Sequence, residues 1–283
     1  MNRQSTEISE IPTRANSLPN AVASADPWAA LQKFTAARIG IGRTGGSQRT
    51  PSILDFRLVH ARARDAVHAP FSSEEIAEKL GACGLESSVL HTLASDKRTY
   101  LMNPDAGRRL CEDSRRKLSG LAAKWGYRDF AIVISDGLSA TAANAHAVPL
   151  AVALFENLPR ENWSAYPIFV VPYARVKIQD GINEILHARH TIILVGERPG
   201  LASPDSLSAY FTYRAKWASV ESDRNCVSNI RPNGFPVAAA AKKLAMLLEE
   251  SRKRSISGTR LKDNIPVSEI GSAAVLPDSA ASD

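Results

Sequence analysis

The sequence FAIVISDGLS, residues 130–139, passes from five apolar residues directly to small and polar ones. Short apolar runs of this kind, rich in β-branched residues, are typical of strands buried on both faces. Similar runs follow at residues 168–171 and 192–195, and stretches with helical spacing separate the three runs, at about residues 138–157 and 176–189. This alternation of strand and helix predicts a parallel sheet with helices on both of its faces.

The region before this sheet has a different pattern. Apolar residues recur every three or four positions between about residues 28 and 121, as at Leu54 and Leu58, which favours helices. Ser72, three residues before Glu75, predicts a helix N-cap with a capping box. The first half of the chain is therefore expected to be mostly helical.

These patterns divide the chain into four parts. We predict a helical N-terminal domain over residues 27–125 and an α/β domain over residues 126–263, in which residues 235–250 supply a further Ala-rich helix. Residues 1–26 are polar without periodicity, and residues 264–283 are rich in Ser and Ala. We expect both ends to be disordered, because neither can bury enough apolar surface.

The composition indicates an ordinary globular protein. The chain has 283 residues, of which 44% are hydrophobic and 23% are charged. The longest apolar stretch, residues 147–155, is far shorter than the roughly 20 residues that a membrane-spanning helix needs. Residues 1–26 lack the apolar run of a secretory signal. We therefore expect a cytoplasmic protein with no membrane contact.

Charge and cysteine content exclude two further classes. The net charge of +6 raises the question of nucleic acid, but basic residues are interspersed with acidic ones. The densest run, RKR at residues 252–254, ends a predicted helix, where cations favour the terminal carbonyls. Cys83, Cys111 and Cys226 lie far apart and form no CxxC pair. We expect no nucleic-acid partner, no disulfide framework and no metal site.

Three polar segments follow the three predicted strands: SDGLS at residues 135–139, PYAR at residues 172–175 and GERPG at residues 196–200. The carboxyl ends of parallel strands share one edge of a sheet, and α/β proteins bind their ligands there. The three segments are therefore predicted to form a ligand site. Ordinary turns, with Glu197 and Arg198 as a solvated pair, are the alternative interpretation.

Other motifs indicate chemistry less clearly. Gly40, Gly42 and Gly45 satisfy the dinucleotide-binding pattern GxGxxG, but no long strand precedes them and Pro51 interrupts the chain where the helix should begin. A flexible turn is the better interpretation. Cys226 has no base in its sequence neighbourhood that would activate it as a catalytic thiol, so a small buried hydrophobe is the more common role.

One predicted helical face is rich in cations, because Arg57, Arg64 and His68 follow one another at helical spacing. A solvated surface is one interpretation of this face. Docking on an acidic neighbouring subunit, or on a cofactor that bears phosphate, is the other.

A series of motifs resembles the small subunits of ethanolamine ammonia-lyase. The motifs occur in that family's order and together span about residues 37–248. Each is short, but the ordered set is specific. They are LDFRL at residues 54–58, HA at 60–61, ARDAVH at 63–68, SDGLSA at 135–140, HAVPL at 146–150, GERPGL at 196–201, and RNC followed by NI within residues 224–230.

The resemblance implies an α/β fold class: a mostly helical N-terminal part followed by a Rossmann-like C-terminal domain with a parallel sheet. It also implies an ammonia-lyase, a carbon–nitrogen lyase that works as an obligate complex with a large subunit in a higher oligomer of heterodimers. The two subunits would hold adenosylcobalamin between them. Ethanolamine would become acetaldehyde and ammonia by a radical mechanism that the cofactor carries.

By the same resemblance, Val176, Glu197 and Cys226 match the family's cobalamin contacts. A corrin is a broad, mostly apolar disc around cobalt, fringed by amides. A valine can pack against it, a carboxylate can accept amide N–H bonds, and backbone beside a small thiol can approach it closely. The resemblance assigns substrate contacts to the large subunit, so we expect neither a catalytic residue nor a metal ligand in this chain.

The chain also departs from some corrinoid proteins. It lacks the DxHxxG motif that supplies a histidine to cobalt, since Asp65 and His68 have the wrong spacing, so we expect the cofactor's own base on the metal. Residues 1–26 show no strong amphipathic pattern for targeting to a bacterial microcompartment, which leaves encapsulation open. The alternative function is a stand-alone α/β enzyme that uses Asp136, Arg175 and Glu197 on a small amine or phosphate.

Overall fold

The structure is a computed structural model, and it describes residues 27–35, 37–159, 161 and 163–264. The chain divides into two compact units, Met1–Ile53 and Leu54–Asp283, and the division falls inside the first α-helix. The disorder expected at residues 1–26 and 264–283 concerns residues that, apart from residue 264, lie outside the described ones.

The first unit contains a 3-10 helix, η1 (Pro27–Phe34), and an antiparallel hairpin of β1 (Arg43–Thr44) and β2 (Ser47–Gln48). Gly45, in the turn of this hairpin, has a φ of 58°, in the left-handed region that glycine adopts readily. The last glycine of the GxGxxG pattern therefore lies in a hairpin turn and not at a strand–helix junction. The prediction of a turn before the helix is confirmed.

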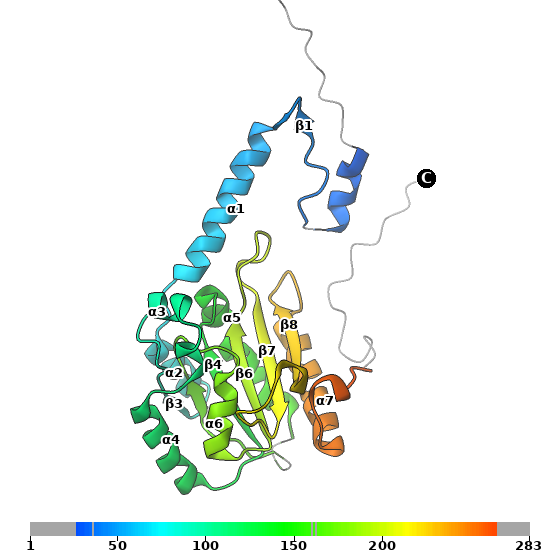
Figure 1. Cartoon of the computed structure of the whole chain (residues 1–283). Helices are drawn as coiled ribbons and strands as arrows, with labels where there is room; N and C mark the ends of the chain where they lie inside the picture. The colour runs from blue at the N-terminus through cyan, green and yellow to red at the C-terminus, as the bar shows by residue number, and fades with distance from the viewer. Residues whose placement is uncertain (1–26, 36, 160, 162, 265–283) are drawn as a thin grey trace, which may run out of the picture. The chain divides into compact units, whose positions relative to one another are not determined.

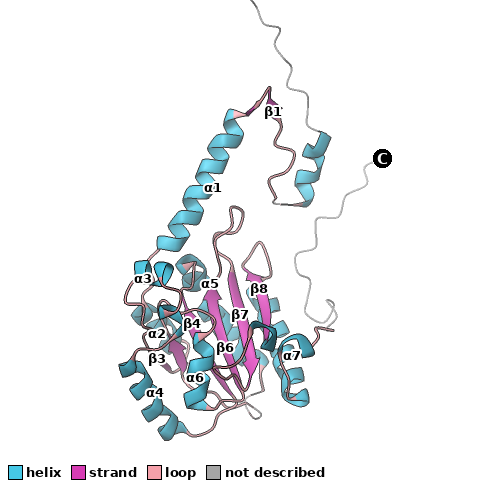
Figure 2. Ribbon diagram, viewed as in Figure 1, coloured by secondary structure: helices cyan, strands magenta, loops and turns pink. Residues whose placement is uncertain are grey.

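The second unit is built on a six-stranded sheet with the order β3-β5-β4-β6-β7-β8 (Figures 1 and 2). The first four strands in this order are parallel, whereas β7 and β8 are antiparallel to their neighbours. The predicted parallel sheet is confirmed, and the structure adds strands that were not predicted. The strands are β3 (Ser87–Val89), β4 (Phe130–Ser135), β5 (Ile168–Val170), β6 (His190–Gly196), β7 (Leu207–Tyr213) and β8 (Arg224–Ile230).

The helices occur where the sequence predicts them, and helix α2 begins at the expected cap. Ser72 Oγ accepts a hydrogen bond of 3.2 Å from the backbone N–H of Glu75. Residues 27–125 are mostly helical, although β3 joins the sheet, and a domain boundary at residue 126 stays a prediction. The helices are α1 (Thr50–His68), α2 (Ser73–Ala82), α3 (Lys97–Met102), α4 (Glu112–Trp125), α5 (Ala140–Asn157), α6 (Ile178–Leu186) and α7 (Val237–Arg254), with 3-10 turns η2 (Ala106–Arg108), η3 (Glu221–Asp223) and η4 (Gly258–Arg260).

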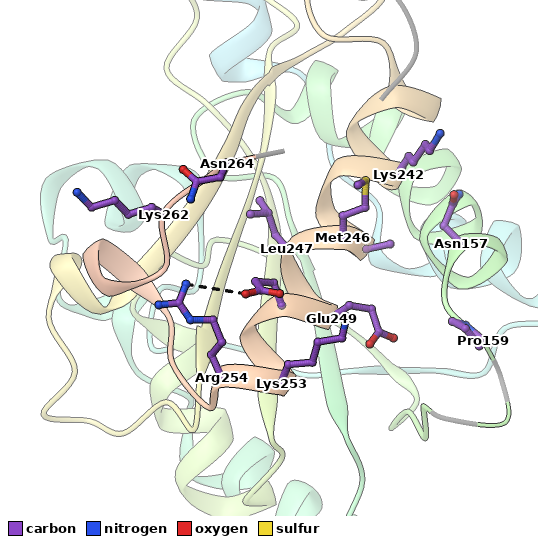
Figure 3. A pocket seen from close by; sticks show the side chains of 12 residues that line it. Asn157, Pro159, Lys242, Met246, Leu247, Glu249, Lys253, Arg254, Lys262 and Asn264 are labelled. Atoms are coloured by element: carbon purple, nitrogen blue, oxygen red, sulfur yellow. Dashed lines mark ion pairs between the residues drawn. The ribbon is translucent and has the colours of Figure 1, made fainter. Parts of the chain in front are cut away.

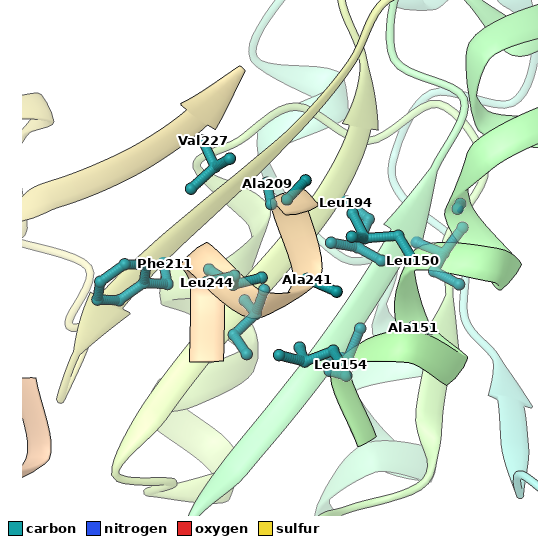
Figure 4. Packing of buried hydrophobic residues seen from close by; sticks show 14 of the residues in the cluster. Leu150, Ala151, Leu154, Leu194, Ala209, Phe211, Val227, Ala241 and Leu244 are labelled. Carbon is teal, nitrogen blue, oxygen red and sulfur yellow. The ribbon is translucent and has the colours of Figure 1, made fainter. Parts of the chain in front are cut away.

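Helices cover both faces of the sheet. On one face, α2, α5 and α7 enclose a core in which Leu154 and Leu244 are fully buried; Figure 4 shows how α5 and α7 meet the strands there. On the other face, α4 and α6 enclose a second core that contains Leu118 and Ile182. Burial of one such aliphatic side chain contributes roughly 2 kcal/mol to folding. The two cores hold the strand ends in place for the loops that follow them.

One buried polar side chain makes this core sensitive to pH. His190, the first residue of β6, is fully buried, and its Nε2 lies 3.0 Å from Ser251 Oγ in α7. Aromatic rings of Trp163 and Tyr213 pack around the imidazole. Burial, helped by the positive charge of Arg189, lowers the pKa of His190 to about 3. The imidazole is therefore neutral in the folded protein.

We expect folding stability to decrease as the pH falls below about 6.5, the ordinary histidine pKa. Between that pH and about 3, the unfolded chain binds a proton on His190 that the folded chain does not. The free energy of unfolding should then lose up to about 1.4 kcal/mol per pH unit through this group. Urea unfolding at several pH values measures this slope. His190→Gln should flatten the slope, whereas the exposed His60→Gln should leave it unchanged; equal slopes in both variants would contradict the assignment.

Candidate functional site

A cleft of about 240 Å³ lies at the carboxyl ends of β4 and β6, at the sheet edge where the sequence predicts a ligand site. We call it the rim cleft. Its walls come from the segments that follow β4, β5 and β6, from strand β7, and from α3, η2 and η3. They include Leu138, Val176, Glu197, Tyr210 and Arg108.

Two glycines close the base of the rim cleft by bringing two backbones together. The N–H of Leu138 donates a hydrogen bond of 2.9 Å to the carbonyl oxygen of Gly196. A Cβ on Gly196 would lie 2.0 Å from the carbonyl oxygen of Ser139, and a Cβ on Gly137 would lie 2.3 Å from the carbonyl oxygen of Gly196. Only glycine fits at either position, so the SDGLS and GERPG motifs form one backbone contact.

Asp136 links the segment after β5 to the base of the rim cleft. Its carboxylate is buried, with Oδ1 accepting the backbone N–H of Tyr173 at 2.7 Å and Oδ2 lying 2.8 Å from the Lys97 ammonium. Lys97 also donates to the carbonyl oxygen of Gly137 at 2.9 Å. Both oxygens of Asp136 are thus occupied by protein donors, and this carboxylate holds the loops together.

Arg175 orients the loop that carries Val176. Its guanidinium donates a hydrogen bond of 2.8 Å to the carbonyl oxygen of Tyr100 and lies 4.4 Å from the centre of the Tyr100 ring. The backbone N–H of Arg175 donates to the carbonyl oxygen of Gly107 at 2.8 Å. Val176 follows this anchored residue and presents a partly exposed, apolar side chain to the rim cleft.

Glu197 meets Tyr210 on the other wall. The Tyr210 hydroxyl donates a hydrogen bond of 2.6 Å to Glu197 Oε1. Tyr210 pairs with Cys226 in the β7–β8 register, so their side chains lie on the same face of the sheet. Burial raises the pKa of Tyr210, and so does its hydrogen bond to Glu197.

The Cys226 thiol is also kept protonated. Cys226 is exposed, so the prediction of a small buried hydrophobe at this position is wrong. Atoms around the sulfur still exclude part of its water, which raises the thiol pKa, and the nearby Glu197 charge raises the pKa further. A protonated thiol is a weak nucleophile, so the surroundings of Cys226 do not suit nucleophilic catalysis.

The two residues before Cys226 anchor strand β8. Arg224 makes a bidentate ion pair with Asp180 of α6, with distances of 2.7 and 2.8 Å, and both side chains are almost fully buried. The side chain of Asn225 bonds backbone groups of Gly258 and Leu261. The first two positions of the RNC motif therefore have structural partners, and they fix where Cys226 stands.

The structure thus brings together two of the three residues predicted to contact a cofactor. Val176 and Glu197 line the rim cleft, whereas Cys226 does not line it but neighbours Tyr210, which does. The prediction missed Tyr100 and Tyr210. Tyr210 belongs to β7, where apolar residues at every second position were a strand signal that the prediction did not use.

A larger cavity, of about 640 Å³, lies along helix α7 (Figure 3). It is bordered by Asn157, the last residue of α5, whereas α5 begins just after the carboxyl end of β4. An 18-residue helix is about 27 Å long, which puts this cavity at the opposite edge of the sheet. Its charged residues have both signs, with Glu250 paired to Arg254 at 3.9 Å. None of the predicted site residues borders it.

Within the part of the chain that the structure describes, no three His, Cys, Asp or Glu side chains gather as a metal site. No helix among the described residues is long and apolar enough to cross a membrane. Cys83, Cys111 and Cys226 are all free thiols.

These features define an α/β protein with a mostly parallel sheet and an open cleft at its carboxyl edge, walled by loops that contact one another through their backbones. A family model described as ethanolamine ammonia-lyase light chain (EutC) matches residues 25–262. The chain belongs to this family.

Individual proteins similar to this chain carry the same family name. The chain is 46% identical over 256 residues to a protein of Azotobacter vinelandii named ethanolamine ammonia-lyase small subunit. The match covers 90% of this chain and 95% of the relative. Proteins of the same name from Pseudomonas syringae pv. tomato and Pseudomonas putida strain F1 are 45% and 46% identical, over 91% and 86% of this chain and 90% and 89% of theirs. The resemblance inferred from the motifs is confirmed.

We expect Gly196→Ala to destabilise the fold by about 3 kcal/mol, because the new methyl group would overlap backbone oxygens that cannot move independently. Denaturant unfolding measures the loss. Gly120→Ala, in the exposed part of α4 with open space around it, is the matched control and should gain about 0.5–1 kcal/mol. Equal stabilities of the Gly196→Ala variant and the parent would show that the two loops are not in contact.

Proposed function

We propose that this chain is the small subunit of an adenosylcobalamin-dependent ethanolamine ammonia-lyase, which converts ethanolamine to acetaldehyde and ammonia. In this proposal the chain holds one side of the cofactor, a separate large subunit holds the other, and such pairs assemble further in the cytoplasm. The observation that carries the proposal is the rim cleft, in which Val176 and Glu197 stand together.

The size of the rim cleft supports a shared site. At about 240 Å³ it is smaller than the roughly 300–1,000 Å³ of complete small-molecule pockets. A ligand as large as a cobalamin would extend well beyond it. The missing walls must then come from another chain, as expected for a subunit that works in a complex.

The side chains present fit the edge of a corrin. Val176 offers an apolar contact to the ring, and Glu197 offers an acceptor to an amide N–H. Tyr210 occupies Glu197 Oε1, and no hydrogen bond to Oε2 is described within residues 27–264. Cys226 adds a small, protonated side chain on the adjoining strand face.

The residues of this chain bind and orient; they do not perform the bond-breaking steps. Asp136 is tied to protein donors, and the Cys226 thiol is protonated. When bound, adenosylcobalamin supplies the radical chemistry. The same observations weigh against the stand-alone enzyme, because Asp136 has no free oxygen for substrate.

Helix α1 offers a contact surface for the large subunit. Of its 19 residues only Ala66 is buried, while Leu54, Phe56 and Leu58 are 58%, 43% and 49% exposed. A helix with so little packing gains most of its stability from a partner. Leu54 and Leu58 lie on the same side of the helix as Arg57 and Arg64, whereas Phe56 faces away from them. We call Leu54, Arg57, Leu58 and Arg64 the α1 surface, and its cations suit an acidic surface on the large subunit.

We expect Glu197→Ala to bind adenosylcobalamin roughly tenfold to a hundredfold more weakly in the complex with the large subunit, because an amide donor loses a charged acceptor. Absorbance titration of the assembled complex, without ethanolamine, measures the affinity. Glu156→Ala, an exposed position at the far end of α5, is the control. Unchanged affinity in Glu197→Ala would remove Glu197 from the site.

Charge reversal on the α1 surface should weaken assembly. We expect the double variant Arg57→Glu/Arg64→Glu to bind the large subunit about tenfold more weakly, as measured by co-purification and by titration of the separate subunits. Lys79→Glu/Lys124→Glu, on exposed faces of α2 and α4, changes the net charge equally and should leave assembly intact. If both double variants assemble like the parent, α1 is not the contact surface.

A further inference from the structure

Among the described residues, Tyr210 donates a side-chain hydrogen bond to the Glu197 carboxylate. Strand β7 places Tyr210 between Ile193 of β6 and Cys226 of β8 in the sheet register. From there its hydroxyl reaches Glu197 Oε1 at 2.6 Å. The raised pKa of the phenol keeps the proton on Tyr210, so the hydroxyl is a permanent donor to this carboxylate.

Glu197 would otherwise be free to rotate. Its backbone is fixed by a hydrogen bond of 2.9 Å from its N–H to the carbonyl oxygen of Ser206, but its partly exposed side chain has three rotatable bonds. A hydrogen bond to one oxygen selects one orientation and leaves the other oxygen as an acceptor. Ordering the carboxylate before a ligand arrives removes an entropic cost from binding.

We propose that Tyr210 is a positioning residue for the cofactor, acting through Glu197; this rests on the proposed function. The Tyr210 hydroxyl holds Oε1 so that Oε2 meets an amide N–H at the edge of the corrin. Strand β7 is rigid, with both neighbours paired, which is the kind of support that a precise ligand contact requires. Tyr210 also connects the wall of the rim cleft to Cys226.

The test is a double-mutant cycle in the assembled complex, with adenosylcobalamin as the probe and absorbance titration as the readout. Tyr210→Phe keeps the ring and removes only the hydroxyl. We expect about tenfold weaker binding in the parent background and no further loss when Tyr210→Phe is added to Glu197→Ala. Tyr213→Phe, in the same strand but beside His190 at its other end, should bind like the parent.

The possible outcomes distinguish the positioning role of Tyr210 from the proposed function. If Tyr210→Phe weakens binding equally with and without Glu197, the effect is not exerted through Glu197 and the positioning role is wrong. If Glu197→Ala weakens binding but Tyr210→Phe does not, the positioning role is wrong and the proposed function stands. If neither variant changes binding, the cofactor site itself is wrong.

A second variant guards against a folding defect. Should Tyr210→Phe fail to assemble, Glu197→Gln tests the same contact, because an amide keeps the size of the side chain but has one accepting oxygen where the carboxylate has two. If that oxygen accepts from Tyr210, the amide presents an NH2 donor to the amide N–H of the corrin. We therefore expect Glu197→Gln to bind adenosylcobalamin about as weakly as Glu197→Ala. Parent-like affinity of Glu197→Gln would overturn the proposal, because a single oxygen cannot hold both contacts.

Discussion

The segment after β4 and the end of β6 touch through their backbones, and the rim cleft depends on this contact. No side chain fits between Gly137 and Gly196, so the two segments lie closer together than any other residue pair would permit. The contact fixes Glu197 directly after Gly196, and the buried Asp136 adds the loop after β5. The three loops that follow β4, β5 and β6 are thereby linked into one wall of the rim cleft.

The parts of the fold that could be predicted are those with an unambiguous apolar signal. Strands β4, β5 and β6 are buried on both faces, and each contains an uninterrupted apolar run of three to five residues, so these strands could be recognised. Strand β3 is three residues long and begins Ser-Ser, and β8 buries only Arg224, Val227 and Ile230. In β8 the burial of Arg224 depends on Asp180, 44 positions earlier, which no local pattern reveals.

The residues of the candidate site could likewise be predicted only in part. Glu197 belongs to a segment that was predicted from its position directly after a buried strand, whereas Val176, just beyond the segment predicted after another strand, came from the resemblance. Cys226 came only from the resemblance, since an isolated cysteine in a polar strand indicates nothing by itself. Tyr210 was missed because its partner Glu197 lies on a different element, and only the register of β6 and β7 brings the two together.

The rim cleft is open, and helix α1 has almost no buried residues. Both features are expected of a chain that binds a partner subunit. We propose that this chain contributes to ethanolamine deamination only in such a complex. The most direct test is acetaldehyde release from ethanolamine with adenosylcobalamin, by the purified chain alone and by the chain mixed with its large subunit. We expect activity in the mixture and none from either subunit alone. Turnover by this chain alone would contradict it.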